Sequence, residues 1–203
     1  RFIPLAEKSG LIHHVGDWVA DAACRQVATW IAQGYEVPRM SINVSGEQFR
    51  RSHLPSMIRR LLSHYGLEAG QLTIELTETA LMLDPDHCSR LLRDLKALGV
   101  GLSIDDFGTG FSSLSSLRRY PIDELKIDRS FIDEVGSNPD ARAITQTILA
   151  MASTLGLSVV AEGVETEQQA ATLRDMACPA GQGYLFARPL SAGEMSRHLR
   201  QRA

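Results

Sequence analysis

The stretch GLSIDDFGTGFSS, residues Gly101–Ser113, lies near the middle of the chain and decides the fold. Apolar Leu102 and Ile104 alternate with polar residues, which predicts a β-strand with Asp105 on the opposite face. Asp106 follows where we expect the strand to give way to a loop. Two adjacent carboxylates at the carboxyl end of a strand suit one or two hard divalent cations. The alternative is that they cap a helix or face solvent.

The rest of this stretch predicts a tight loop followed by a helix. Gly108 and Gly110 permit sharp turns, because glycine has no Cβ to restrict its backbone. Ser112 or Ser113 is then expected to cap a short helix that ends near Arg119.

Strand patterns alternate with helical patterns along the whole sequence. Such alternation is typical of parallel βα units, arranged either as a doubly wound sheet or as a (β/α) barrel. The first strand is not followed by the glycine pattern Gly-x-Gly-x-x-Gly that a dinucleotide-binding sheet requires. Besides the strand beginning at Gly101, the predicted strands are Met40–Val44, Leu72–Leu76, Glu124–Ile127, Ser158–Ala161 and Gly181–Phe186. Capping boxes are predicted at Ser45 with Gln48, Thr166 with Gln169, and Ser191 with Glu194.

Composition indicates one globular domain over residues 1–203. Hydrophobic residues make up 44% of the chain, and no apolar run is long enough to cross a membrane, so we expect no membrane contact by this domain. The net charge of −3 and the absence of a basic stripe argue against long nucleic acid as a partner. Cys24, Cys88 and Cys178 are widely spaced, as expected of reduced thiols in a cytoplasmic protein.

Polar side chains recur at or near the carboxyl end of successive predicted strands. In a barrel these ends converge on one mouth, where such enzymes keep their chemistry. Each residue alone would more often be a surface residue, but the series together favours a functional site and favours the barrel. The series comprises Asn43, Glu75, Asp105, Lys126, Asp128 and Glu162. Gln182 is an exception, because it lies early in its predicted strand.

The donors in this series are oxygen atoms, with no clustered His or Cys. Carboxylate and amide oxygens favour Mg²⁺ or Mn²⁺ over zinc. Among so many acids, Lys126 could orient a water molecule or neutralise a phosphate. An internal salt bridge between Lys126 and Glu162 is compatible with both roles.

Along essentially its whole length the chain resembles the EAL family of bacterial cyclic di-GMP phosphodiesterases. The resemblance rests on six motifs that are specific only in combination. They are Asn43-Val44-Ser45, Glu75-Leu76-Thr77-Glu78, Asp105–Ser113, Lys126-Ile127-Asp128, Glu162-Gly163-Val164-Glu165 and Gln182-Gly183-Tyr184.

The resemblance implies a TIM-like (β/α) barrel that hydrolyses cyclic di-GMP to linear pGpG with two Mg²⁺ or Mn²⁺ ions. It implies that Lys126 lies beside the attacking water, that Asp128 and Glu165 support the centre, and that Gln182 belongs to the substrate pocket. It also implies that Glu78 tethers the loop after Asp105, coupling the site to a homodimer. The metal ligands that it implies are Asn43, Glu75, Asp105, Asp106 and Glu162. Ca²⁺ is expected to inhibit, because it tolerates longer bonds and irregular geometry.

One feature departs from the family pattern. The Glu-Ala-Leu strand that names the family, and whose Glu is a further metal ligand, does not occur here. Six predicted strands also fall short of the eight of a closed barrel. We therefore expect an N-terminal segment to be missing, and a sensory or GGDEF-type domain to be fused upstream.

Two rival functions remain at this stage. One is a non-catalytic cyclic di-GMP receptor, although receptors of this family typically lose several of the acids that are present here. The other is a structural barrel without a ligand, which would leave a buried carboxylate cluster unexplained.

Overall fold

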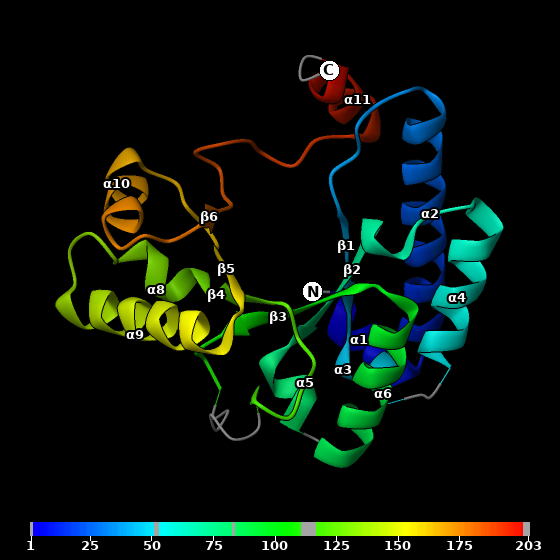
Figure 1. Ribbon diagram of the computed structural model, residues 1–203, viewed down its shortest axis with the longest axis horizontal. Coiled ribbons are helices and arrows are strands. Elements are labelled where there is room, and N and C mark those ends of the chain that lie inside the picture. Colours follow the sequence, from blue (N-terminus) through cyan, green and yellow to red (C-terminus); the bar gives the residue numbers. More distant parts are fainter. Residues whose placement is uncertain (1, 51–52, 83, 111–116, 201–203) are drawn as a thin grey trace. The chain divides into compact units, whose positions relative to one another are not determined.

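The computed structural model describes residues 2–50, 53–82, 84–110 and 117–200. The chain divides into two compact units, Arg1–Leu102 with Leu190–Ala203, and Ser103–Pro189. Strands in both units alternate with helices (Figure 1), and strands that neighbour one another within a unit pair in parallel. The α/β prediction is therefore confirmed. The helix expected to begin at Ser112 or Ser113 lies largely outside the described residues.

The first unit is built around two parallel strands, β1 (Met40–Val44) and β2 (Leu72–Thr77), which pair with Asn43 opposite Glu75. Helix α2 packs against β1 and α4, and α4 packs against α6. The side chain of Trp30 in α2 donates to Ser196 in α11 at 2.8 Å, which fixes the returning C-terminal helix. The helices are α1 (Ile3–Ser9), α2 (Ile12–Ala32), α3 (Gly46–Phe49), α4 (Leu54–Tyr65), the 3₁₀ turn η1 (Ala69–Gln71), α5 (Glu78–Met82), α6 (Pro85–Leu98) and α11 (Ala192–Arg200).

The second unit holds β3 (Gly101–Phe107) from Ser103 onward, followed by three more parallel strands. These are β4 (Glu124–Ile127), β5 (Ser158–Ala161) and β6 (Ala180–Gly181), each paired with the strand before it. Helix α9 (Pro139–Leu155) packs on β4 and β5, and α8 (Arg129–Asp133) packs on α9. Helix α10 (Glu167–Asp175) follows β5. Fully buried side chains, such as Leu125 and Ile127, form the interior of this unit.

The capping predictions are confirmed, and they explain where several helices begin. In each box the hydroxyl accepts from the backbone N–H three residues later, while the side chain of that later residue accepts from the cap's own N–H. Reciprocal bonds of this kind join Ser45 to Gln48, Thr166 to Gln169, and Ser191 to Glu194. Asp128 and Asn138 cap α8 and α9 through their side chains.

The prediction of a sixth strand over Gly181–Phe186 is wrong. Strand β6 ends at Gly181, and the chain then turns, with Phe186 N–H donating to Gly183 O at 3.1 Å. The cause is a close backbone approach, because a Cβ at Gly183 would overlap the main chain of Val164. The third strand runs two residues further than expected, to Phe107, and its register shifts between Ile104 and Phe107.

No helix in the described part of the chain is both long enough and apolar enough to serve as a membrane span. This finding agrees with the absence of a long apolar run in the sequence.

We expect Thr166→Ala to lower the free energy of unfolding by about 1 kcal/mol, because an N-terminal cap of α10 is lost. For a chain of this size, that corresponds to a fall in Tm of about 2–4 °C, measurable by thermal melting followed by circular dichroism. Thr147→Ala is the matched control. Among the described residues, the Thr147 hydroxyl bonds only back along α9, to Ala143 O, so this change should leave Tm level or slightly raised. Equal Tm values for the two variants would contradict the capping role.

Candidate functional site

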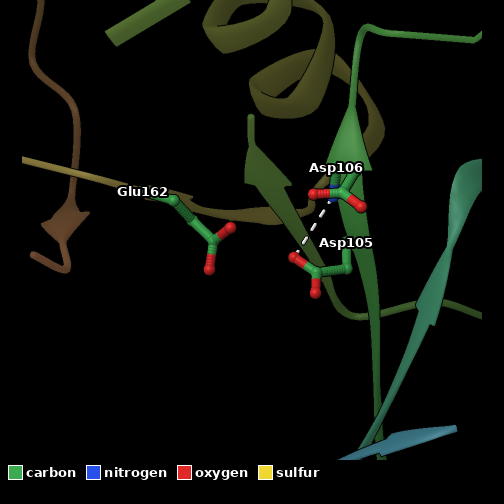
Figure 2. A group of neighbouring side chains, drawn as sticks. All are labelled: Asp105, Asp106 and Glu162. Carbon is green, nitrogen blue, oxygen red and sulfur yellow. Dashed lines mark hydrogen bonds between the residues drawn. The ribbon is translucent and has the colours of Figure 1, made fainter. Parts of the chain in front are cut away.

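Three carboxylates meet at the carboxyl ends of the strands of the second unit. Asp105 and Asp106 lie at the end of β3, and Glu162 follows the last residue of β5. One oxygen atom from each lies within 4.8 Å of the others. Figure 2 shows Asp105 and Glu162 extending from their separate strands toward the same space. The sequence prediction that these side chains come together is confirmed.

Lys126, in the strand between them, provides the balancing charge. Its ammonium nitrogen Nζ lies 2.6 Å from Glu162 Oε1 and 3.3 Å from Asp105 Oδ1. Lys126 is only 5% exposed, so its charge is shielded from water and depends on these acids. The salt bridge that the sequence suggested between Lys126 and Glu162 is therefore present.

The backbone of Asp106 has an unusual conformation for a residue other than glycine. Its φ angle is 54°, in the left-handed region that Asp and Asn tolerate better than most residues. Its N–H donates to its neighbour Asp105 Oδ1 at 3.1 Å, the bond drawn as a dashed line in Figure 2. This turn at the end of β3 lets two consecutive carboxylates approach Glu162.

Burial and like charge raise the pKa values of two of these acids. The pKa of Asp106 is raised by burial first, then by the negative charges of Asp105 and Asp128. The pKa of Glu162 is also raised by burial, although Lys126 acts in the opposite direction. Without a further cation, the three carboxylates repel one another, and a single ammonium does not offset this.

Asp128 and Glu165 lie on the segments that follow β4 and β5. Asp128 accepts from Ser130 N–H at 2.9 Å and so caps α8, while its charge acts on Asp106. Glu165 is exposed, and its Oε1 lies 3.0 Å from Nη2 of Arg129. Sequence reasoning missed Arg129, although it directly follows the motif Lys126-Ile127-Asp128. Because β4 and β5 are neighbours, residues that follow their ends lie close together, and this could have suggested a contact between Arg129 and Glu165.

Gln182 directly follows β6, because this strand ends at Gly181. Its N–H donates to Ala161 O at 2.8 Å, and its carbonyl accepts from Val164 N–H at 3.0 Å. Gln182 therefore lies at the carboxyl end of its strand, like the other members of the series, and its side chain is exposed.

The first unit holds the remaining predicted residues. Asn43 is exposed near the end of β1, and its partner in the parallel register is Glu75, which is 5% exposed on β2. Glu78 begins α5 and is 2% exposed. Both Asn43 and Glu75 therefore lie near strand carboxyl ends, as the sequence predicted.

The chemistry of the second-unit cluster suits a divalent metal ion. Its donors are carboxylate oxygens from three positions, the ligand type that Mg²⁺, Mn²⁺ and Ca²⁺ prefer. No sulfur or imidazole ligand belongs to the cluster among the described residues, so its composition disfavours zinc. The residues present therefore fit the metal that the sequence predicts.

Known proteins similar to this chain align with most of its length. A sequence model described as the EAL domain matches residues 1–189. The chain is 46% identical over 195 residues to the bifunctional diguanylate cyclase/cyclic di-GMP phosphodiesterase MucR of Pseudomonas aeruginosa. It is 48% identical over 200 residues to the cyclic di-GMP phosphodiesterase NbdA of the same organism, and 44% identical over 195 residues to the oxygen sensor protein DosP of Escherichia coli. These alignments cover 96–98% of this chain but only 24–28% of each relative, so the chain spans about a quarter of their length.

Solved structures of similar sequence share the fold. The PaMucR phosphodiesterase in complex with c-di-GMP matches with a TM-score of 0.92 at 46% identity, over 96% of this chain and 78% of that one. The EAL domain of Mycobacterium smegmatis DcpA matches with a TM-score of 0.88 at 38% identity, over 94% and 86% of the two chains. Klebsiella pneumoniae BlrP1, solved as a manganese and cyclic di-GMP complex, matches with a TM-score of 0.78 at 29% identity, over 87% and 45%.

These likenesses confirm the predicted TIM-like fold class. On the family match over residues 1–189, the chain belongs to the EAL domain family.

Proposed function

We propose that this chain is a metal-dependent phosphodiesterase that hydrolyses cyclic di-GMP to pGpG. The observation that carries the proposal is the convergence of Asp105, Asp106 and Glu162 around the buried ammonium of Lys126. Family relatives named as cyclic di-GMP phosphodiesterases support the choice of substrate.

Each residue of the cluster has a distinct task in the proposed reaction. Asp105, Asp106 and Glu162 would hold divalent cations, together with Asn43 and Glu75 from the ends of β1 and β2. When bound, two such cations supply Lewis acidity toward the phosphodiester and lower the pKa of water. The Lys126 ammonium, held between two acids, is suited to orient a water molecule or to neutralise a phosphate oxygen.

The remaining predicted residues act around this centre. Asp128 and Glu165 would support it from the segments after β4 and β5, and Gln182 would contribute to the substrate pocket. Glu78, buried at the start of α5, would hold the loop that follows β3.

We also propose a wider setting for the domain. The chain would function in the cytoplasm as a homodimer, joined to sensory or GGDEF-type domains. The greater length of the curated relatives supports the proposed connection to further domains.

The direct test is to incubate the purified full-length protein with cyclic di-GMP and Mn²⁺ or Mg²⁺, and to follow pGpG by chromatography. We expect turnover with either ion and no turnover with Ca²⁺, which should inhibit when added to the Mn²⁺ reaction. Ca²⁺ accepts longer bonds and irregular geometry, so it should occupy the acids without aligning the reacting groups. Equal rates with Ca²⁺ and Mg²⁺ would contradict this mechanism. Tight binding of cyclic di-GMP without turnover would indicate a receptor instead.

A second prediction concerns Asp106→Asn, which keeps a side chain suited to a positive φ. We expect it to reduce kcat by about a hundredfold or more, because a ligand that places the catalytic cation is lost. The fold should persist, since the change removes a like charge from Asp105 and Asp128.

The same variant should alter how the stability of the metal-free protein depends on pH. The pKa of Asp106 is raised in the folded state, so its protonation stabilises the fold at low pH. This contribution to stability is lost as the pH rises from the pKa of Asp in the unfolded chain, about 3.9, through the raised pKa of Asp106 in the folded protein. In EDTA, Asp106→Asn should therefore match or exceed wild-type Tm near neutral pH, with the difference shrinking toward pH 4. Asp94→Asn, at an exposed position of α6, should show no such trend. A large fall in Tm for Asp106→Asn alone would mark Asp106 as structural.

A further inference from the structure

The segment that joins β5 to α10 carries two of the acids, Glu162 and Glu165, and is held by backbone hydrogen bonds. Glu162 N–H donates to Ile127 O at 3.1 Å, which ties its start to the end of β4. On its other side, Val164 N–H donates to Gln182 O and Leu185 N–H donates to Val164 O, each at 3.0 Å. The loop 162–165 is therefore fastened through its main chain to the end of β4 and to the segment that follows β6.

Arg129 adds a side-chain fastening to this loop. It is the first residue of α8, directly after Asp128, so the end of β4 fixes its backbone position. The stem of its side chain lies against Gly163, where a Cβ would overlap Cγ of Arg129 and lie 2.9 Å from its Cβ and Cδ. The φ angle of Gly163 is +72°, so glycine is favoured there on conformational grounds as well.

The guanidinium group of Arg129 joins two acids. Its Nε lies 3.2 and 3.1 Å from the two carboxylate oxygens of Asp133, the last residue of α8. Its Nη2 reaches Glu165 Oε1 at 3.0 Å. The planar guanidinium suits this geometry, because its donors point in fixed directions. Arg129 is thus anchored on its own helix while it holds the far end of the loop.

We propose that Arg129 is a positioning residue that fixes the loop 162–165, and through it the carboxylates of Glu162 and Glu165. This inference rests on the proposed phosphodiesterase function. The side chains of Arg129 and Glu165 are 53% and 37% exposed, so their ion pair contributes little to global stability. A displacement of about 1 Å in a catalytic group is nevertheless enough to cost about a hundredfold in rate. Arg129 should therefore matter far more for turnover than for folding.

The chain offers a matched control for this separation. Arg174 pairs with Glu167 at 3.7 Å on α10, in the same unit, and both side chains are exposed. Arg174→Ala removes a comparable surface pair, and among the described residues Arg174 makes no hydrogen bond or ion pair with the loop 162–165.

The first experiment compares Arg129→Ala, Arg129→Lys and Arg174→Ala in Mn²⁺-supported hydrolysis of cyclic di-GMP. For Arg129→Ala we expect kcat to fall about tenfold to a hundredfold while KM changes much less, because the loop carries groups of the reaction centre. Arg129→Lys should retain more of the wild-type kcat than Arg129→Ala, since lysine keeps the positive charge but lacks the planar set of donors of the guanidinium group. All three variants should melt within about 3 °C of wild type. Wild-type kcat for Arg129→Ala, or an equal loss for Arg174→Ala, would overturn the proposal.

A double-mutant cycle tests whether Arg129 acts through Glu165. In the Glu165→Gln background, Arg129→Ala should reduce kcat by less than about twofold, because the partner that it positions is already altered. Fully multiplicative losses would show that Arg129 acts independently of Glu165 and would overturn the proposal.

Hydrogen exchange separates this inference from the proposed function. Amides of residues 162–165, followed by mass spectrometry without substrate, should exchange faster in Arg129→Ala and at the wild-type rate in Arg174→Ala. If the wild-type chain does not hydrolyse cyclic di-GMP but the loop still loosens selectively, the positioning role stands and the proposed function fails. If exchange is unchanged in Arg129→Ala, the positioning role fails, whatever the activity.

Discussion

A buried ammonium group between two acids is the interaction on which the second unit depends. Removing a charged amine from water costs several kcal/mol unless close partners of opposite charge compensate it. Lys126 meets this requirement through Asp105 on β3 and Glu162 after β5, one on each side of its own strand. The three strand ends are therefore tied together by charge as well as by their hydrogen-bonded register. Truncating Lys126 would leave two carboxylates facing each other in a poorly solvated space.

The same ammonium reduces the repulsion within the cluster of acids without cancelling it. Burial and, after it, like charges at this spacing favour protonation, and the raised pKa values of Asp106 and Glu162 reflect both effects. Lys126 lowers the pKa of both groups and keeps their oxygens close. Carboxylate oxygens held close together in this way would need little reorganisation to bind a divalent ion.

Sequence reasoning found the features that depend on short-range chemistry. The bounds of β1, β4 and β5 follow from apolar alternation, and the helix starts at Thr166 and Ser191 follow from capping chemistry. The convergence of Asp105 and Glu162 follows from the parallel arrangement, since equivalent strand ends meet at one edge.

Features that depend on contacts between distant segments were not predictable in the same way. The early end of β6 is set by the approach of Gly183 to Val164, and no local pattern reports that contact. The pair between Arg129 and Glu165 joins the first residue of α8 to the loop that follows β5, so its partners share no sequence motif. The positive φ of Asp106 also depends on how the end of β3 shifts register against β4, which alternation alone does not encode.

The close packing of Gly183 on Val164 has a consequence for how such a site can diverge. Gly183 meets the main chain of Val164 directly, so no side chain at position 183 separates the segments that carry Glu162 and Gln182. Substitutions that change the edge of the site are therefore expected at neighbouring exposed positions. Tyr184 and Arg188 are such positions, and they stack with the Arg188 guanidinium carbon 4.7 Å from the ring centre. Substitutions at these two positions should therefore alter the periphery of the site, while the spacing between the segments that carry Glu162 and Gln182 stays constant.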